Sequence, residues 1–178
     1  RGEGVAVSDD GRLVPVPRWR ERAELEEPVV LAGVLAAGGS LLVATGHPAR
    51  LYRVEGSSAT LLAELPGEQA TAVMGRPDGS VLVATVSPAV LVEVRGGRVE
   101  EVGRLGEGGC WDLLEVGGQV VAAAGPPASL YRLGERGLER WAELPDAHAR
   151  CLGASGDAVV VGTSGKGLIL RVGPDASV

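Results

Sequence analysis

Aromatic and sulfur-containing side chains are scarce in this sequence. Phenylalanine is absent, Phe, Trp and Tyr together make up 3% of the 178 residues, and there are 2 cysteines and 2 histidines. The hydrophobic core must therefore be built mainly from Val, Leu and Ala. Cys110 and Cys151 are too few for a disulfide scaffold and lack zinc-type spacing. We expect two buried or half-buried thiols, and a disulfide between them stays open.

Long hydrophobic runs and excess positive charge are missing as well. No apolar stretch approaches the ~20 residues that a membrane-spanning helix needs, and the longest, 29–43, is broken by glycine and serine. The formal net charge of −6 provides no basic field for nucleic acid or anionic lipid. We therefore expect no nucleic-acid partner and no membrane insertion.

Cofactor motifs are absent too. The stretch GTSGKGLILRV (162–172) superficially resembles a phosphate-binding loop, but Val160 replaces the first glycine and Gly167 replaces the magnesium-binding hydroxyl. No stretch has the alternating oxygen donors of a calcium loop, and no serine lies in a Gly-x-Ser-x-Gly context. We expect no metal and no other cofactor.

Turn residues and an internal repeat are what the sequence has in abundance. There are 28 glycines and 11 prolines, and four 11-residue stretches align without gaps. They read ATGHPARLYRV, ATVSPAVLVEV, AAGPPASLYRL and GTSGKGLILRV, and they start 40, 39 and 39 residues apart. A period near 40 with four short β-like runs per unit is typical of a β-propeller blade. The predicted fold is all-β, with about four four-stranded antiparallel blades.

The repeat also predicts the organisation of the chain. The expected units are 28–66, 67–106, 107–145 and 146–172, preceded by a hairpin or edge segment in 1–18. The fourth unit lacks an outer strand, and residues 19–25 resemble the outer strands of the other units, so we expect them to close the ring. Three arrangements stay open: a small four-bladed ring, self-association of two chains in a larger ring, or half of a longer polypeptide. The absence of an initiator methionine and the abrupt C-terminus favour the last.

One unit supports a family resemblance. LPDAHARCLGASGDAVVVGTSGKGLILRV resembles the repeats of large secreted bacterial β-propeller proteins of the WD-repeat-like type. The match lies in fold-forming positions, and the Trp-Asp dipeptide of true WD repeats is missing from the end of the third strand. The Trp111–Asp112 pair lies on an innermost strand instead. The resemblance implies a secreted or periplasmic location and carries no activity to particular residues.

A binding face is predicted from the position of the loops. The loops before the innermost strands and those between second and third strands open on the same face of a propeller, where function concentrates. The candidate residues on that face are His47, Glu68, Gln69, Glu107, Trp111, Asp112, Asp146, His148, Arg150 and Lys166. Trp111 is either a plug of the central channel or a stacking platform for a ligand.

Two classes of function remain. We expect a non-catalytic β-propeller module that binds a protein or small-molecule ligand, and no enzyme, because the ionisable residues of the inner loops do not recur as a matched set. The alternative is a propeller-type lyase or hydrolase with its site at the central channel. An enzyme would need His, carboxylate or Arg side chains that converge from several blades.

Overall fold

The computed structural model describes residues 4–15, 23–36 and 38–178 of the chain. These residues form seventeen β-strands, β1 to β17, and contain no helix. The described part of the chain therefore has no helix that could cross a membrane. The predicted all-β class is confirmed.

The first two strands form a sheet of their own. β1 (Val5–Val7) pairs antiparallel with β2 (Leu13–Pro15). The Ser8 amide donates to the Arg12 carbonyl at 2.8 Å, and Gly11 has a φ of 79°, which glycine adopts without strain. The Ser-Asp-Asp-Gly segment thus forms the turn between the two strands.

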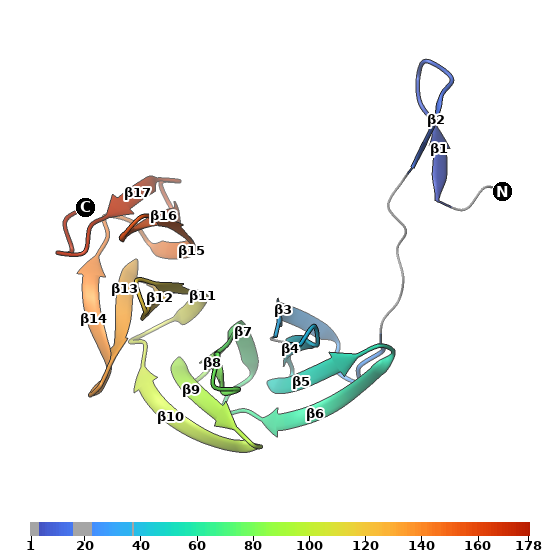
Figure 1. The fold of residues 1–178 in the computed structure, drawn as a ribbon. Coiled ribbons are helices and arrows are strands. Elements are labelled where there is room, and N and C mark those ends of the chain that lie inside the picture. The colour runs from blue at the N-terminus through green and yellow to red at the C-terminus, as the bar shows by residue number, and fades with distance from the viewer. Residues whose placement is uncertain (1–3, 16–22, 37) are drawn as a thin grey trace.

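The other strands form four blades arranged in an arc (Figure 1). Blade 1 consists of β3 (Val29–Leu35), β4 (Leu41–Gly46), β5 (Arg50–Glu55) and β6 (Ser58–Glu64). Blade 2 consists of β7 (Gln69–Gly75), β8 (Val81–Val86), β9 (Val90–Arg95) and β10 (Arg98–Arg104). Blade 3 consists of β11 (Gly109–Val116), β12 (Gln119–Gly125), β13 (Ser129–Gly134) and β14 (Gly137–Glu143). Blade 4 consists of β15 (His148–Ser155), β16 (Ala158–Ser164) and β17 (Ile169–Val172).

Within a blade, consecutive strands pair antiparallel in chain order. Figure 1 shows the first strand of each blade on the inner side of the arc and the fourth strand, where present, on the outer side. A single residue pair, Gly46 with Gln69, joins blades 1 and 2 into one extended sheet. The described part of blade 4 has three strands, as the sequence predicted.

The core lies between the blades. Small and β-branched side chains of the second and third strands of one blade pack against the same strands of the next blade, which forms three clusters along the arc. Leu51, Leu91 and Leu130 occupy the same repeat position, and each is 0% exposed because the following blade covers it. Ile169, at that position in blade 4, is 83% exposed because no described segment covers that side of the blade.

The segment before β3 also contacts the arc. Residues 19–22 of the predicted closing strand lie outside the described residues, and 23–25 are described but are not in a strand. Ala23 and Leu25 pack against Val43, Tyr52 and Val54 on the face of blade 1 that looks away from blade 2. The closing strand stays a prediction.

Candidate functional site

Each innermost strand contains a β-bulge, which leaves one residue without a partner on the second strand. The pairing register skips one residue in β3, β7, β11 and β15. The skipped residues are Leu31, Thr71, Trp111 and Arg150. A bulge bends its strand and re-aims a side chain, and these four lie on strands that line the inner side of the arc (Figure 1).

Residues at successive bulges reach the neighbouring blade. Thr71 Oγ1 donates to the Cys110 carbonyl oxygen at 2.5 Å, which links β7 to β11. The guanidinium carbon of Arg150 lies 4.1 Å from the centre of the Trp111 ring, a cation–π contact that links β15 to β11. The bulges therefore bring together side chains that are a whole repeat apart in sequence.

His148 completes a group with these two residues. Its ring packs edge-to-face on Trp111, with 6.0 Å between ring centres and an interplanar angle of 79°. We call Trp111, His148 and Arg150 the axial cluster. An aromatic ring, an imidazole and a guanidinium from blades 3 and 4 thus share one place on the inner side of the arc.

Two features of strands β11, β12 and β15 hold the axial cluster in place. Gly125 allows the close approach of β12 to β15, because a Cβ atom there would lie 2.6 Å from the Ala147 oxygen and 2.7 Å from His148 Cα. The Asp112 carboxylate accepts hydrogen bonds from the amides of Leu113 and Leu152, each at 2.8 Å. Asp112 therefore ties β11 to β15 beneath the cluster.

Polar atoms of the axial cluster are left without partners among the described residues. Trp111 Nε1 and His148 Nδ1 are buried and make no hydrogen bond there. Arg150 Nε donates to Ser164 Oγ at 3.0 Å, while its two terminal nitrogens make no hydrogen bond or ion pair with a described residue. An unpaired buried donor or acceptor costs stability and is often explained by function.

Asp146 and Lys166 form a separate group that holds a turn. The Asp146 carboxylate accepts from Thr163 Oγ1 at 2.5 Å and from the amides of Ala147 and Lys166. The hydrogen bond from Thr163, with these amides, lowers the pKa of Asp146 below its usual range. Lys166 Nζ donates to the Pro145 carbonyl at 2.8 Å. The stretch that resembled a phosphate-binding loop is thus a turn between β16 and β17.

The remaining predicted site residues lie elsewhere. His47 Nε2 is 2.9 Å from Gln69 Nε2, and the His47 amide donates to the Glu68 carbonyl, so these three residues meet at the junction of blades 1 and 2. Glu107 is exposed in the loop before β11. The structure therefore divides the predicted face between two blade junctions, with His47 and His148 on blades 1 and 4.

The two cysteines are free thiols. Cys110 is buried in the core, where burial raises its pKa to about 12. Cys151 is exposed, and this differs from the predicted buried or half-buried state because its side of blade 4 is uncovered. In the part of the chain that the structure describes, no group of three or more His, Cys, Asp or Glu residues could hold a metal ion.

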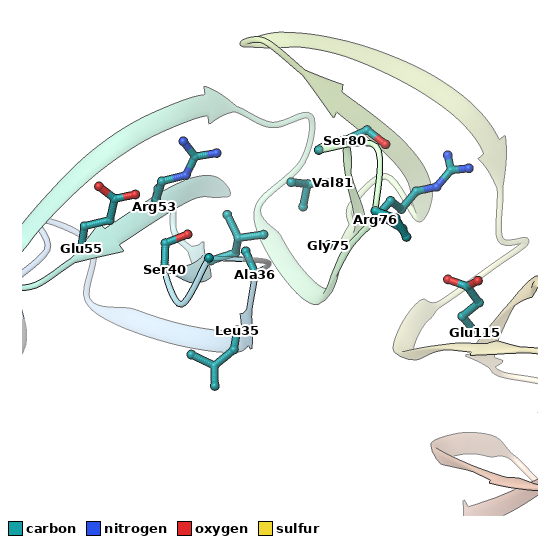
Figure 2. A pocket seen from close by; sticks show the side chains of 14 residues that line it. Leu35, Ala36, Ser40, Arg53, Glu55, Gly75, Arg76, Ser80, Val81 and Glu115 are labelled. Atoms are coloured by element: carbon teal, nitrogen blue, oxygen red, sulfur yellow. The ribbon is translucent and has the colours of Figure 1, made fainter.

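A cleft of about 550 Å³ lies at the opposite end of the innermost strands, between blades 1 and 2. Figure 2 shows Arg53 and Ser40 of blade 1, Arg76 of blade 2 and Glu115 of blade 3 around it. Arg76 is already paired with Glu93 at 3.0 Å, and acidic and basic side chains line the cleft together. The described lining of this cleft contains no histidine or cysteine, so the axial cluster, which includes an imidazole, is the better candidate.

Comparison with solved structures identifies the fold. No family model and no curated protein matches the sequence. Virginiamycin B lyase from Staphylococcus aureus is similar with a TM-score of 0.67 and 13% identity, and its catalytically inactive histidine-to-alanine variant with quinupristin has a TM-score of 0.75 and 11% identity. The chain has the fold of a β-propeller. A gluconolactonase-like protein is similar with a TM-score of 0.58 and 17% identity.

These alignments cover nearly all of this chain but only part of each similar structure. The alignments cover 97% of this chain but 64% and 60% of the two lyase chains, and 67% of the gluconolactonase-like chain. The chain thus spans about three fifths of the length of the lyases. At these identities the likeness shows the fold.

One prediction from the sequence is contradicted by the comparison. We expected a non-catalytic binding module, whereas the similar structures include lyases and a gluconolactonase-like protein. The enzyme alternative agrees better with these neighbours. The prediction from the sequence depended on a matched set of ionisable residues recurring in the inner loops, and it missed the bulge position at which different residue types meet. The resemblance to WD-repeat-like secreted proteins is supported only as far as the propeller fold.

Proposed function

We propose that this chain provides part of the active site of a propeller-type lyase or hydrolase, on the inner side of blades 3 and 4. His148 transfers the proton in this reaction. The catalytic group and the residues around it come from β11 and β15, whose bulges bring them together.

The observation that carries the proposal is the unpaired imidazole of His148. Its Nδ1 makes no hydrogen bond to a described residue, and neither ring nitrogen pairs with a described carboxylate. Imidazole is the side chain that most often transfers protons near neutral pH. Trp111 and the backbone at Gly125 hold the ring from two sides.

The names of the similar structures suggest which substrates to try. One neighbour is a lyase in complex with quinupristin, and another is gluconolactonase-like. We therefore propose a substrate with an ester or lactone group. In a lyase reaction His148 takes a proton from the carbon next to the one that bears the ester oxygen, a C=C bond forms, and the C–O bond breaks to release a carboxylate. In a hydrolase reaction His148 takes a proton from water, the water oxygen bonds to the carbonyl carbon, and the acyl C–O bond breaks to release an alcohol. General acid–base catalysis of this kind contributes typically 10²–10⁴-fold to a rate.

The test is turnover of quinupristin and gluconolactone by the 178-residue chain, followed by mass spectrometry. We expect ring opening of at least one of the two, and a loss of roughly 10²-fold or more in kcat/KM for His148→Ala. The companion variant His47→Ala should lose less than about tenfold, because its ring is engaged with Gln69 at the other blade junction. Equal activity of His148→Ala and the wild type would refute the proposal, and so would a complete lack of turnover.

A further inference from the structure

Arg150 is exposed, and two contacts of its guanidinium leave part of its charge unused. Its guanidinium lies 4.1 Å from the centre of the Trp111 ring, and its Nε donates to Ser164 Oγ at 3.0 Å. These two contacts use one face and one edge of the guanidinium. The edge that carries the terminal nitrogens is free of partners among the described residues.

The two carboxylates that are close to the axial cluster in sequence are already engaged. Asp112 accepts from two backbone amides of β11 and β15. Asp146 accepts from the Thr163 hydroxyl and from the amides of Ala147 and Lys166. No described acidic side chain forms an ion pair with Arg150. Arg132 likewise has no described ion pair and lies 3.5 Å from the centre of the Trp141 ring, but only Arg150 of these two lies on an innermost strand.

We infer that Arg150 binds a carboxylate of the substrate through its terminal nitrogens. The inference rests on the proposed active site and adds a feature of its substrate, a carboxylate carried on the same molecule as the ester or lactone group. The planar fork of a guanidinium matches the two oxygens of a carboxylate, and such bidentate pairs are the strong ones. Because Trp111 and Ser164 already fix the Arg150 side chain, a ligand loses less affinity to side-chain ordering.

The surroundings favour a singly charged, planar anion over phosphate. Phosphate sites usually combine several cationic groups or backbone amides. Lys166, the other cation near this end of blade 4, has its ammonium on the Pro145 carbonyl and belongs to the turn. The formal net charge of −6 further opposes the approach of highly charged anions.

The ligand would lie directly beside the proposed proton-transfer group. Trp111 contacts both Arg150 and His148, so a carboxylate on the free edge of Arg150 places the rest of the molecule along the inner side of blades 3 and 4. Toward blades 2 and 1 the bulge positions continue with Thr71 and Leu31. Leu31 is exposed and apolar, so the end of the substrate away from the carboxylate can be apolar.

The experiment measures binding of benzoate by calorimetry, with tryptophan fluorescence as a second readout. Benzamide, a neutral molecule of the same shape, and inorganic phosphate are the comparison ligands. We expect millimolar binding of benzoate, at least tenfold weaker binding of benzamide, and no tighter binding of phosphate. Arg150→Gln should weaken benzoate binding at least tenfold, and Arg150→Lys should weaken it by a smaller factor because it keeps the charge and loses the fork.

Controls separate this inference from the proposed function. Arg171→Gln removes an exposed arginine of the same blade and should leave benzoate binding unchanged within twofold. His148→Ala should lose turnover but bind benzoate within about threefold of the wild type. Wild-type benzoate affinity in a folded Arg150→Gln variant overturns the inference, as does tighter binding of phosphate or an equal affinity for benzamide. If Arg150→Gln fails to fold, the Arg150→Lys variant decides by the same comparison.

Discussion

Replacing one residue at the same repeat position in two blades tests the arrangement of the blades. Leu130 is 0% exposed on the side of blade 3 that faces blade 4, and Ile169 is 83% exposed at the equivalent position of blade 4. Leu130→Ala leaves a cavity between two blades and should destabilise the chain by about 2–5 kcal/mol. Ile169→Ala removes a side chain that is mostly in water, so it should change the free energy of unfolding by about 0.5 kcal/mol or less.

Urea unfolding followed by circular dichroism measures both effects under identical conditions. Leu91→Ala serves as a second buried member of the series, because Leu91 is 0% exposed and packs against blade 3. The two buried variants should lower the urea midpoint clearly, and Ile169→Ala should leave it near the wild-type value. An Ile169→Ala variant that is as unstable as Leu130→Ala would refute the claim that this side of blade 4 is exposed.

Three further outcomes follow from single contacts. Iodoacetamide at pH 8 should alkylate exposed Cys151 and spare Cys110, because burial raises the pKa of Cys110 to about 12. Mass spectrometry of the labelled native and unfolded protein measures this, and rapid labelling of Cys110 in the native protein would contradict it. Gly125→Ala should lower the free energy of unfolding by about 1–3 kcal/mol, because the added Cβ atom crowds His148. A Cβ atom at Gly153 has no neighbour within 4 Å, so Gly153→Ala should lower it by less. The melting temperatures of the two variants test this difference. The pKa of Asp146 is lower in the folded than in the unfolded protein, so the ionised carboxylate stabilises the fold above the unfolded pKa of about 4, and this contribution is lost as the pH falls further. Asp146→Asn should therefore reduce the loss of stability at acidic pH. An unchanged loss would exclude this role.

The blade architecture could be predicted from the sequence because it depends on local, repeated features. Glycine and proline interrupt every apolar run before it is long enough for a helix, and the alignment of Leu51, Leu91 and Leu130 fixes the spacing of the blades. The three-stranded fourth blade followed from counting apolar runs. These signals recur in each unit, so the strands of an ambiguous unit can be assigned by aligning it with the others.

The candidate site could be predicted only as a face. The list of loop residues included all three members of the axial cluster, but nothing in the sequence separated them from Asp146 and Lys166, whose side chains hold a turn. The separation depends on β-bulges, which place Trp111 of blade 3 against Arg150 of blade 4. A bulge adds one residue without a characteristic residue type in these strands, since the four positions hold Leu, Thr, Trp and Arg. A comparison of the strand register between the repeats could have found the bulge position, although not the contact between Trp111 and Arg150.

The position of proton transfer is the central claim, and chemical rescue tests it most directly. His148→Ala removes the imidazole next to Trp111 and leaves a space of its size beside Gly125. Added imidazole should then restore turnover of the substrate that the wild type opens, in proportion to its concentration and with the unprotonated form as the active species. Added imidazole should leave the activity of His47→Ala unchanged, because that variant retains His148. A His148→Ala variant that is folded and inactive but gains no activity with imidazole up to high concentration would contradict the account.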